Sequence, residues 1–536
     1  MSRLRVTVVV LALIAAAVTP PAHAADRTDI PLKNWGGFSL YRDAVYDDLE
    51  RLVASGLGDR AVLNTKPISR HAAARLVAHA IEKIRRDSSG VYNNRPDLEP
   101  VVDRLIKEFR TELAALGVKI PGGDVPAPSW FSFTPLDRAQ ARFGMTTRDF
   151  RLENRQGLAF QRGVNAGTTF ETRAQLGDYV SFYLQPELHG NEEYGAARLA
   201  QGYVKLTLFN VELVAGRESL GWGPGYHGSL IMSNNAPPLD HVRIGSAEPF
   251  RLPLIGDWIG PTKILAFMAQ LEARRDIPRT KLGGLRASIA PFEFLELGAS
   301  YVNQFGGDTP PRLRGLGDHL RLFVDPEASD QDDVSPRFRN NVLFALDGEL
   351  RFSNVDRFYL PMRDVRIYGE FGWDDTCCST AYIPFRPAIS WLFGVHGIGL
   401  LGDDTIEGRF EMASTSELSF VHNQFTRGYW TRGFPIAHYI GTDGFDTFTR
   451  ITKRFDDALM VGVGMRIGEI GDTLLENAGR PRERRYGGSL DVTYKLTEAW
   501  SVFGQADVMR ATNRNFVAGD DGWDAVVFLE VTRAFR

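Results

Sequence analysis

Cysteine is scarce in this chain of 536 residues, which has only 2, Cys377 and Cys378. A disulfide-stapled scaffold is therefore excluded, and no Cys/His spacing matches a structural zinc site. Adjacent cysteines are bridged only through a strained ring, so the sequence leaves their redox state open. Catalytic motifs are missing as well. Because no G-x-S-x-G, H-E-x-x-H or Walker loop occurs, we predict no enzymatic activity and no cofactor.

A strong excess of charge of one sign is also missing, since 62 Lys and Arg stand against 66 Asp and Glu. This balance argues against a nucleic-acid partner. Beyond residue 24 no apolar run approaches the roughly 18 residues of a membrane-spanning helix. The mean hydropathy of −0.19 is typical of a soluble protein. A transmembrane β-barrel has a similar average, however, because its apolar residues alternate with polar ones.

Residues 1–24 have the pattern of a signal peptide. Arg3 and Arg5 precede an apolar stretch from Val6 to Val18, and Ala22-His23-Ala24 is a small-x-small cleavage site. We expect export and cleavage after Ala24. The mature chain would then be periplasmic, secreted or located in the outer membrane.

Residues 25–128 are predicted to form a small helical domain. Apolar residues recur at helical spacing behind Asp43, after the N-cap candidate Ser69, and from Pro96 to Gly117. Each helix would have an apolar and a charged face, so the domain needs a surface to pack against. We expect it to plug the periplasmic mouth of the following domain. The Pro- and Gly-rich stretch 121–128 marks the boundary.

Residues 129–536 are predicted to form an outer-membrane β-barrel. The apolar period changes from 3.6 to 2, as where Val180, Phe182, Leu184 and Leu188 alternate with polar residues. Tight turns such as 291–293 alternate with long polar loops at about 218–240, 306–338, 372–382, 423–446 and 511–523. Short turns at one rim and long loops at the other are typical of such barrels. A soluble propeller would need a repeat of ~40–50 residues, which is absent.

Three stretches of the chain resemble a known family. They are Tyr46–Leu52 with Ser55–Leu57 and Lys66–Arg70, then Ala215–Gly225 with Ser233–Asp240, and finally Ile440–Gly444. They are similar to the Wzi family of capsule assembly outer-membrane lectins. The resemblance implies about 18 antiparallel strands, a mouth covered by helices, and binding of exported capsular polysaccharide at the cell surface.

The first loop with candidate polysaccharide-binding residues contains Gly-Trp-Gly-Pro-Gly at 221–225, which indicates a constrained loop at the outer rim or folded into the lumen. Its aromatic residues would stack on sugar rings, and its polar residues would bond sugar hydroxyls. The alternative is that they only fix the loop. The candidates are Arg217, Trp222, Tyr226, Asn234, Asn235 and Asp240.

The second candidate loop mixes cations with aromatic residues. Its candidates are Arg427, Tyr429, Trp430, Arg432 and Asp443, with His438 and Tyr439 beside them. Arginine forms paired hydrogen bonds with the carboxylates of acidic sugars. The alternative is an aromatic girdle with lipopolysaccharide contacts. A separate acidic stretch at 325–333 is either a solvated loop or a Ca²⁺ site without EF-hand spacing.

Two functions fit these features. The first is attachment of capsular or other surface polysaccharide to the cell surface by an outer-membrane barrel. Its partners would be that polysaccharide, outer-membrane lipids and lipopolysaccharide, and the chain would be a monomer. The alternative is a carbohydrate-selective porin. The motif at 221–225 and the run from Asn234 to Asp240 favour the first, and a conductance measurement distinguishes the two.

Overall fold

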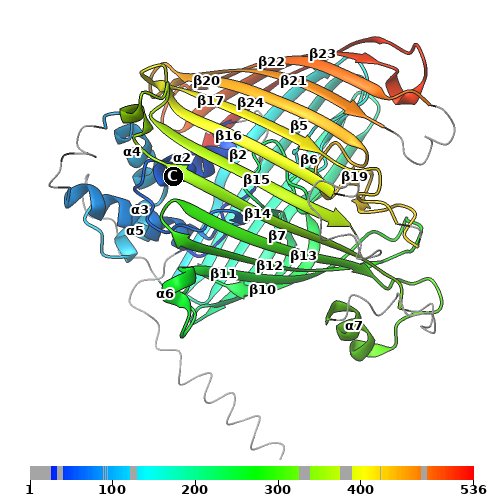
Figure 1. Cartoon of the computed structure of the whole chain (residues 1–536), viewed down its shortest axis with the longest axis horizontal. Coiled ribbons are helices and arrows are strands. Elements are labelled where there is room, and N and C mark those ends of the chain that lie inside the picture. Colours follow the sequence, from blue (N-terminus) through cyan, green and yellow to red (C-terminus); the bar gives the residue numbers. More distant parts are fainter. Residues whose placement is uncertain are drawn as a thin grey trace, which may run out of the picture.

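Eighteen of the described strands form one closed antiparallel barrel (Figure 1). The computed structural model describes residues 26–32, 40–87, 90, 92, 95–120, 130–324, 338–374, 389–422, 424–471 and 480–535. The barrel strands are β2 (Phe131–Thr146), β5 (Gly163–Leu176), β6 (Val180–Asn191), β7 (Gly195–Leu208), β8 (Val211–Glu218), β10 (Leu239–Ser246), β11 (Thr262–Gln270), β12 (Lys281–Phe292), β13 (Leu295–Phe305), β14 (Asn340–Phe352), β15 (Asp364–Asp374), β16 (Ile389–Leu400), β17 (Asp403–Ser414), β20 (Gly444–Arg454), β21 (Leu459–Ile470), β22 (Glu483–Lys495), β23 (Trp500–Thr512) and β24 (Gly522–Ala534). β2 pairs with β5 and with β24, which closes the ring. The predicted barrel of about 18 strands is confirmed.

The wall of the barrel is apolar outside and polar inside. On β6, Phe182, Leu184 and Leu188 are 42%, 46% and 51% exposed, whereas Ser181 and Gln185 are buried on the inner face. A protein surrounded by lipid has this arrangement, because its outward side chains replace water contacts by contacts with acyl chains. The helices of the described residues are all too short or too polar to cross a membrane.

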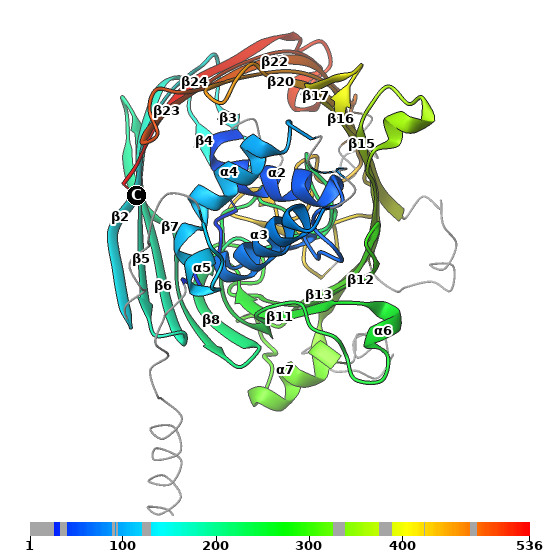
Figure 2. The ribbon, with the colours of Figure 1, turned by 90° about the vertical axis from the view of Figure 1, so that its left-hand side faces the viewer.

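Four described helices occupy the mouth at which short turns join the strands. They are α2 (Leu40–Ala54), α3 (Arg70–Arg85), α4 (Glu99–Glu108) and α5 (Arg110–Ala115). Seen from that end, they lie inside the ring of strands (Figure 2). Lys83 lies 3.6 Å from Glu293 in the β12–β13 turn, and Lys107 lies 3.1 Å from Glu498 in the β22–β23 turn. The long loops therefore lie at the opposite rim.

The helices match the first two predicted helices and differ from the third. Ser69 caps α3 by accepting a hydrogen bond from the Ala72 N–H at 3.1 Å. The third predicted helix is divided into α4 and α5 at Phe109, where ψ is 24°. Arg70 explains the division, because its guanidinium donates to the Glu108 carbonyl at 2.5 Å and lies 5.1 Å from the Phe109 ring.

Apart from β1 (Thr65–Lys66), which lies between α2 and α3, the remaining elements lie in the connections between barrel strands. Three short strand pairs are β1 with β9 (Gly221–Trp222), β3 (Phe150–Arg151) with β4 (Ala159–Phe160), and β18 (Trp430–Thr431) with β19 (Phe434–Pro435). The loops also hold α6 (Gly256–Ile259), α7 (Gly315–Val324), η3 (Val355–Phe358) and η4 (Arg514–Phe516). The predicted signal peptide at 1–24, Cys377, Cys378 and the acidic stretch 325–333 lie outside the described residues.

Candidate functional site

The first candidate loop is folded into the lumen of the barrel. Every residue from Glu218 to Leu239 is buried. Gly223 has a φ of +105°, and a Cβ at this position would lie 2.1 Å from a carboxylate oxygen of Glu370. Only glycine fits there, which explains part of the Gly-Trp-Gly-Pro-Gly motif.

Trp222 and Tyr226 contact other parts of the protein inside the lumen. Trp222 is 1% exposed, and its ring lies 5.5 Å from that of Phe267 in a T-shaped arrangement. In Tyr226, the ring lies 4.0 Å from the Arg409 guanidinium, and the backbone N–H donates to Glu411 at 2.7 Å. Burial is the main reason that the pKa of the Tyr226 hydroxyl lies above its usual value.

Asn234 and Asn235 link the first loop to the β2–β5 connection, which contains Gln156, and to the β17–β20 connection, which contains Pro435. The Gln156 N–H donates to the Asn234 carbonyl at 2.9 Å, and the Asn235 side-chain amide donates to the Pro435 carbonyl at 3.1 Å. Both residues are buried. An external polymer can reach them, or Trp222 and Tyr226, only if the loop opens. Sugar contact by these four side chains stays a prediction.

The connection between β17 and β20 (residues 415–443) covers the first loop from outside. The Ser233 N–H donates to the Ile436 carbonyl at 3.0 Å. The two connections share one apolar cluster with the barrel wall, which includes Leu220, Trp222, Ile231, Met232, Phe420, Tyr429, Phe434 and Ile436. Tyr429 is fully buried in this cluster, and burial raises the pKa of its hydroxyl. Tyr429 thus faces the core and not solvent.

Three other candidates of this connection remain accessible at the outer rim. Arg427 and Arg432 are exposed, and Trp430 between them is half-buried. We call these three residues the rim cluster. Trp430 lies over Gly441, where an added Cβ would come within 2.9 Å of the indole. Glycine therefore leaves room for the indole at this place.

The backbone of the rim cluster is held by the loop at 271–280. The Arg427 N–H donates to Asp276 at 2.9 Å, the Arg432 N–H donates to Glu272 at 3.2 Å, and Arg275 donates to the Trp430 carbonyl at 3.0 Å. Burial alone would raise the pKa of Asp276, but the Arg427 N–H and other donors lower it below its usual value. An ionised Asp276 thus fixes the backbone, while the Arg427 and Arg432 side chains point to solvent.

The last three candidates do not belong to the rim cluster. On the outward face of the wall, Arg217 of β8 and Asp240 of β10 form a paired contact with distances of 2.6 and 2.7 Å. Asp443 accepts a hydrogen bond from Arg482 at the rim near β22. The structure therefore divides the predicted residues into a buried group, an outer-wall pair, the rim cluster and the separate Asp443.

Sequence reasoning missed the supporting residues of loop 271–280 and a second arginine-rich part of the rim. In the second part, Arg484 lies 2.9 Å from Glu469, and Arg485 lies 2.7 Å from Glu483. The dense charge in both stretches is visible in the sequence. In the rim cluster, however, each supporting residue lies more than 150 residues from its partner, as for Arg427 and Asp276.

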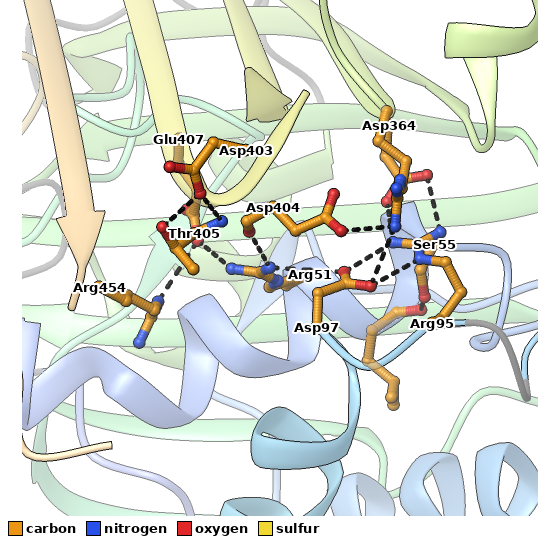
Figure 3. Close-up of polar contacts among 12 residues, drawn as sticks. Arg51, Ser55, Arg95, Asp97, Asp364, Asp403, Asp404, Thr405, Glu407 and Arg454 are labelled. Carbon is orange, nitrogen blue, oxygen red and sulfur yellow. Dashed lines mark hydrogen bonds and ion pairs between the residues drawn. The ribbon is translucent and has the colours of Figure 1, made fainter. Parts of the chain in front are cut away.

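Buried ion pairs fasten the helices to the opposite mouth (Figure 3). Arg51 of α2 donates to Glu407 at 2.5 Å and to the Asp404 carbonyl at 2.8 Å. Arg95 bridges Asp97 at 2.8 Å and Asp364 at 2.7 Å. The β1 strand then reaches β9, where Thr65 pairs with Trp222. The helical region and the first candidate loop thus contact each other inside the barrel.

Comparison with known proteins gives three findings. The family model described as "Capsule assembly protein Wzi" matches residues 139–525. A Klebsiella pneumoniae protein, described as an uncharacterized 55.8 kDa protein in the cps region, is 30% identical over 190 residues, which cover 33% of this chain and 35% of that protein. The match thus spans about a third of that relative's length. The solved Escherichia coli Wzi has a TM-score of 0.66 at 20% identity, over 91% of this chain and 97% of that one.

The solved relative is described as an outer membrane protein involved in group 1 capsule assembly and as a carbohydrate-binding β-barrel. At 20% identity, its likeness to this chain shows the fold. Neither this description nor that of the family refers to catalysis. The matched family confirms the resemblance that the sequence carries, and with it the prediction of a capsule assembly protein. The chain belongs to the Wzi family of capsule assembly proteins.

Proposed function

We propose that this protein binds exported capsular or other surface polysaccharide through the rim cluster and attaches it to the cell surface. The observation that carries the proposal is an arrangement of two exposed arginines around a half-buried tryptophan at the long-loop rim. The carbohydrate-binding relative of the same fold supports it. Such a site binds its ligand without changing it, so no catalytic step is involved.

The chemistry of the rim cluster suits an acidic polymer. An indole stacks on the apolar face of a sugar ring, and guanidinium groups form paired hydrogen bonds with carboxylates. Each such contact contributes roughly 1–3 kcal/mol, so one cluster binds weakly. A long polymer is retained nevertheless, because many barrels bind the same chain at once.

The filled lumen favours attachment over the porin alternative. The Gly223 N–H donates to the Asn64 carbonyl at 2.9 Å, so the outer loop and the helical region are in direct contact inside the barrel. As part of the proposal, residues 25–128 form a periplasmic plug domain and residues 129–536 the barrel. The protein is a monomer whose apolar outer wall contacts lipid and lipopolysaccharide. Steady open channels in a planar bilayer would support the porin instead.

The proposal is tested by changing Arg427, Trp430 and Arg432 together to Ala. Because their backbone is held by other residues, the barrel should reach the surface in normal amounts. We expect less retained capsule and more polysaccharide in the medium. The matched control is Arg484→Ala with Arg510→Ala, which removes two exposed arginines from another part of the same rim. Full retention of capsule by the triple variant would exclude the rim cluster as the glycan site.

A further inference from the structure

A groove of about 570 Å³ runs along the outward face of β7, β8, β10, β11 and β12. Small residues make it deep, since Gly202 and Ala215 lie where larger side chains would fill it. Leu199, Val242 and Met268 complete its apolar lining. Val242 is 51% exposed, which places this lining on the lipid-facing side of the wall.

A polar row crosses the end of the groove that lies nearest the long loops. Arg217 is paired in register with Asp240, and Gln270 with Lys281. His241 pairs with Ala269 on the strands between them, so the two pairs lie next to each other. The next outward-facing residues away from the rim are Ala215, Val242 and Met268, which are apolar and paired across the strands. The groove therefore has one polar end and one apolar end.

The charges at the polar end are predominantly positive. Asp240 contacts Arg217 at 2.6 Å, and Arg432 of the rim cluster also attracts the Asp240 carboxylate. The Lys281 ammonium donates to the neutral Gln270 amide, and it forms no ion pair with a residue in the part of the chain that the structure describes. Arg279 and Asp308 beside it neutralise each other at 2.6 Å.

We propose that this groove binds an outer-leaflet lipid with a phosphorylated sugar headgroup. Its acyl chain would lie on Ala215, Val242 and Met268. The phosphate would meet the cations of Arg217 and Lys281, and Asp240 and Gln270 would accept or donate hydrogen bonds to sugar hydroxyls. This site goes beyond polysaccharide binding, because it faces the membrane and not the exterior. It would anchor the barrel wall directly below the rim cluster.

The test uses the purified full-length protein in detergent micelles and native mass spectrometry. The probes are bis-phosphorylated lipid A, dephosphorylated lipid A and phosphatidylglycerol. In Arg217→Gln/Lys281→Gln we expect affinity for bis-phosphorylated lipid A to fall about tenfold, since two charge-assisted contacts are lost. The matched control is Arg484→Gln/Arg510→Gln, which removes two outward-facing rim arginines from β22 and β23 and should change the affinity less than about twofold.

A second variant, Ala215→Trp, fills the apolar end without changing the charge, and it should weaken the binding of both forms of lipid A. Heat-dependent gel migration checks that each barrel is folded. Wild-type affinity of either variant for bis-phosphorylated lipid A would overturn the proposal. So would an equal loss in the control variant, or an equal loss for phosphatidylglycerol. If Arg217→Gln/Lys281→Gln instead loses acidic polysaccharide and keeps lipid A, the row is a polymer site, and the proposed function survives while this inference fails.

Discussion

The two ends of the barrel are closed by different physical means. At the short-turn end, buried charges join the helices to the wall, as between Glu50 and Arg366 at 2.5 Å. At the long-loop end, two connections pack an apolar cluster that includes Trp222 and Ile436, and backbone hydrogen bonds join them. The exposed arginines lie only on top of this second layer. Charged contacts dominate the first closure, whereas the second adds a large apolar cluster to its hydrogen bonds with Glu370 and Glu411.

This difference has consequences for how each end responds to change. A buried ion pair is expensive to desolvate and adds little net stability, but the loss of either partner strongly destabilises the fold. It therefore fixes the orientation of the helices more than it strengthens them. An apolar cluster is stabilised by burial and has no such directional demand. The outer end can thus present exposed charges that contribute little to its own stability.

The largest effect should come from removing the short-turn closure altogether. Deletion of residues 26–120 should leave a barrel that still assembles, because all barrel strands begin after residue 130. We expect its conductance in planar bilayers to rise well above that of the full chain. Heat-dependent gel migration controls for assembly. If conductance is unchanged, the helical region is not the plug, and the outer loops alone close the barrel.

Arg366→Ala should be a strongly damaging single change at the helical end. Arg366 contacts Glu50 at 2.5 Å and Glu349 at 2.7 Å, so its loss leaves two buried carboxylates without this partner. Such a loss costs about 3–5 kcal/mol. The helical region should then become sensitive to trypsin while the barrel remains intact. Arg86→Ala is the control, because that side chain is 77% exposed and its pair with Glu82 contributes little.

The sequence predicted the wall of the barrel better than the helices and loops that occupy its lumen. Alternation along one strand is local information, and Phe182 and Leu184 face outward as expected. The division of the third helix depends on Arg70, which lies 38 residues from the carbonyl that it contacts. Trp222 and Trp430 illustrate the same limit, since both occur in glycine-rich loops with nearby polar residues. Only the three-dimensional packing makes one a core residue and the other part of the rim.

Trp222→Ala separates these two roles at the outer end. Because Trp222 is 1% exposed, its truncation leaves a cavity in the apolar cluster and should cost about 3–5 kcal/mol. We expect the outer loops to become sensitive to protease, while the folded fraction keeps its affinity for polysaccharide. Trp258→Ala is the control, because that tryptophan is 85% exposed. Loss of affinity without loss of protection would make Trp222 a sugar ligand after all.

Acidification should loosen the helical end. Burial alone would raise the pKa of Glu50, but Arg366, Lys66 and Arg409 outweigh it and lower the pKa from 4.5 to about 2. A carboxyl group with a lowered pKa in the folded state contributes stability above its unfolded pKa, and this contribution is lost as the pH falls through 4.5 toward the folded pKa of about 2. The shift corresponds to roughly 3 kcal/mol at most. We expect the melting temperature of the helical circular-dichroism signal to fall over this range. Glu50→Gln should melt at a lower temperature at neutral pH and lose much of this pH dependence, whereas the exposed Glu82→Gln should behave as the wild type. An unchanged acid response in Glu50→Gln would mean that other carboxylates of this end control its docking.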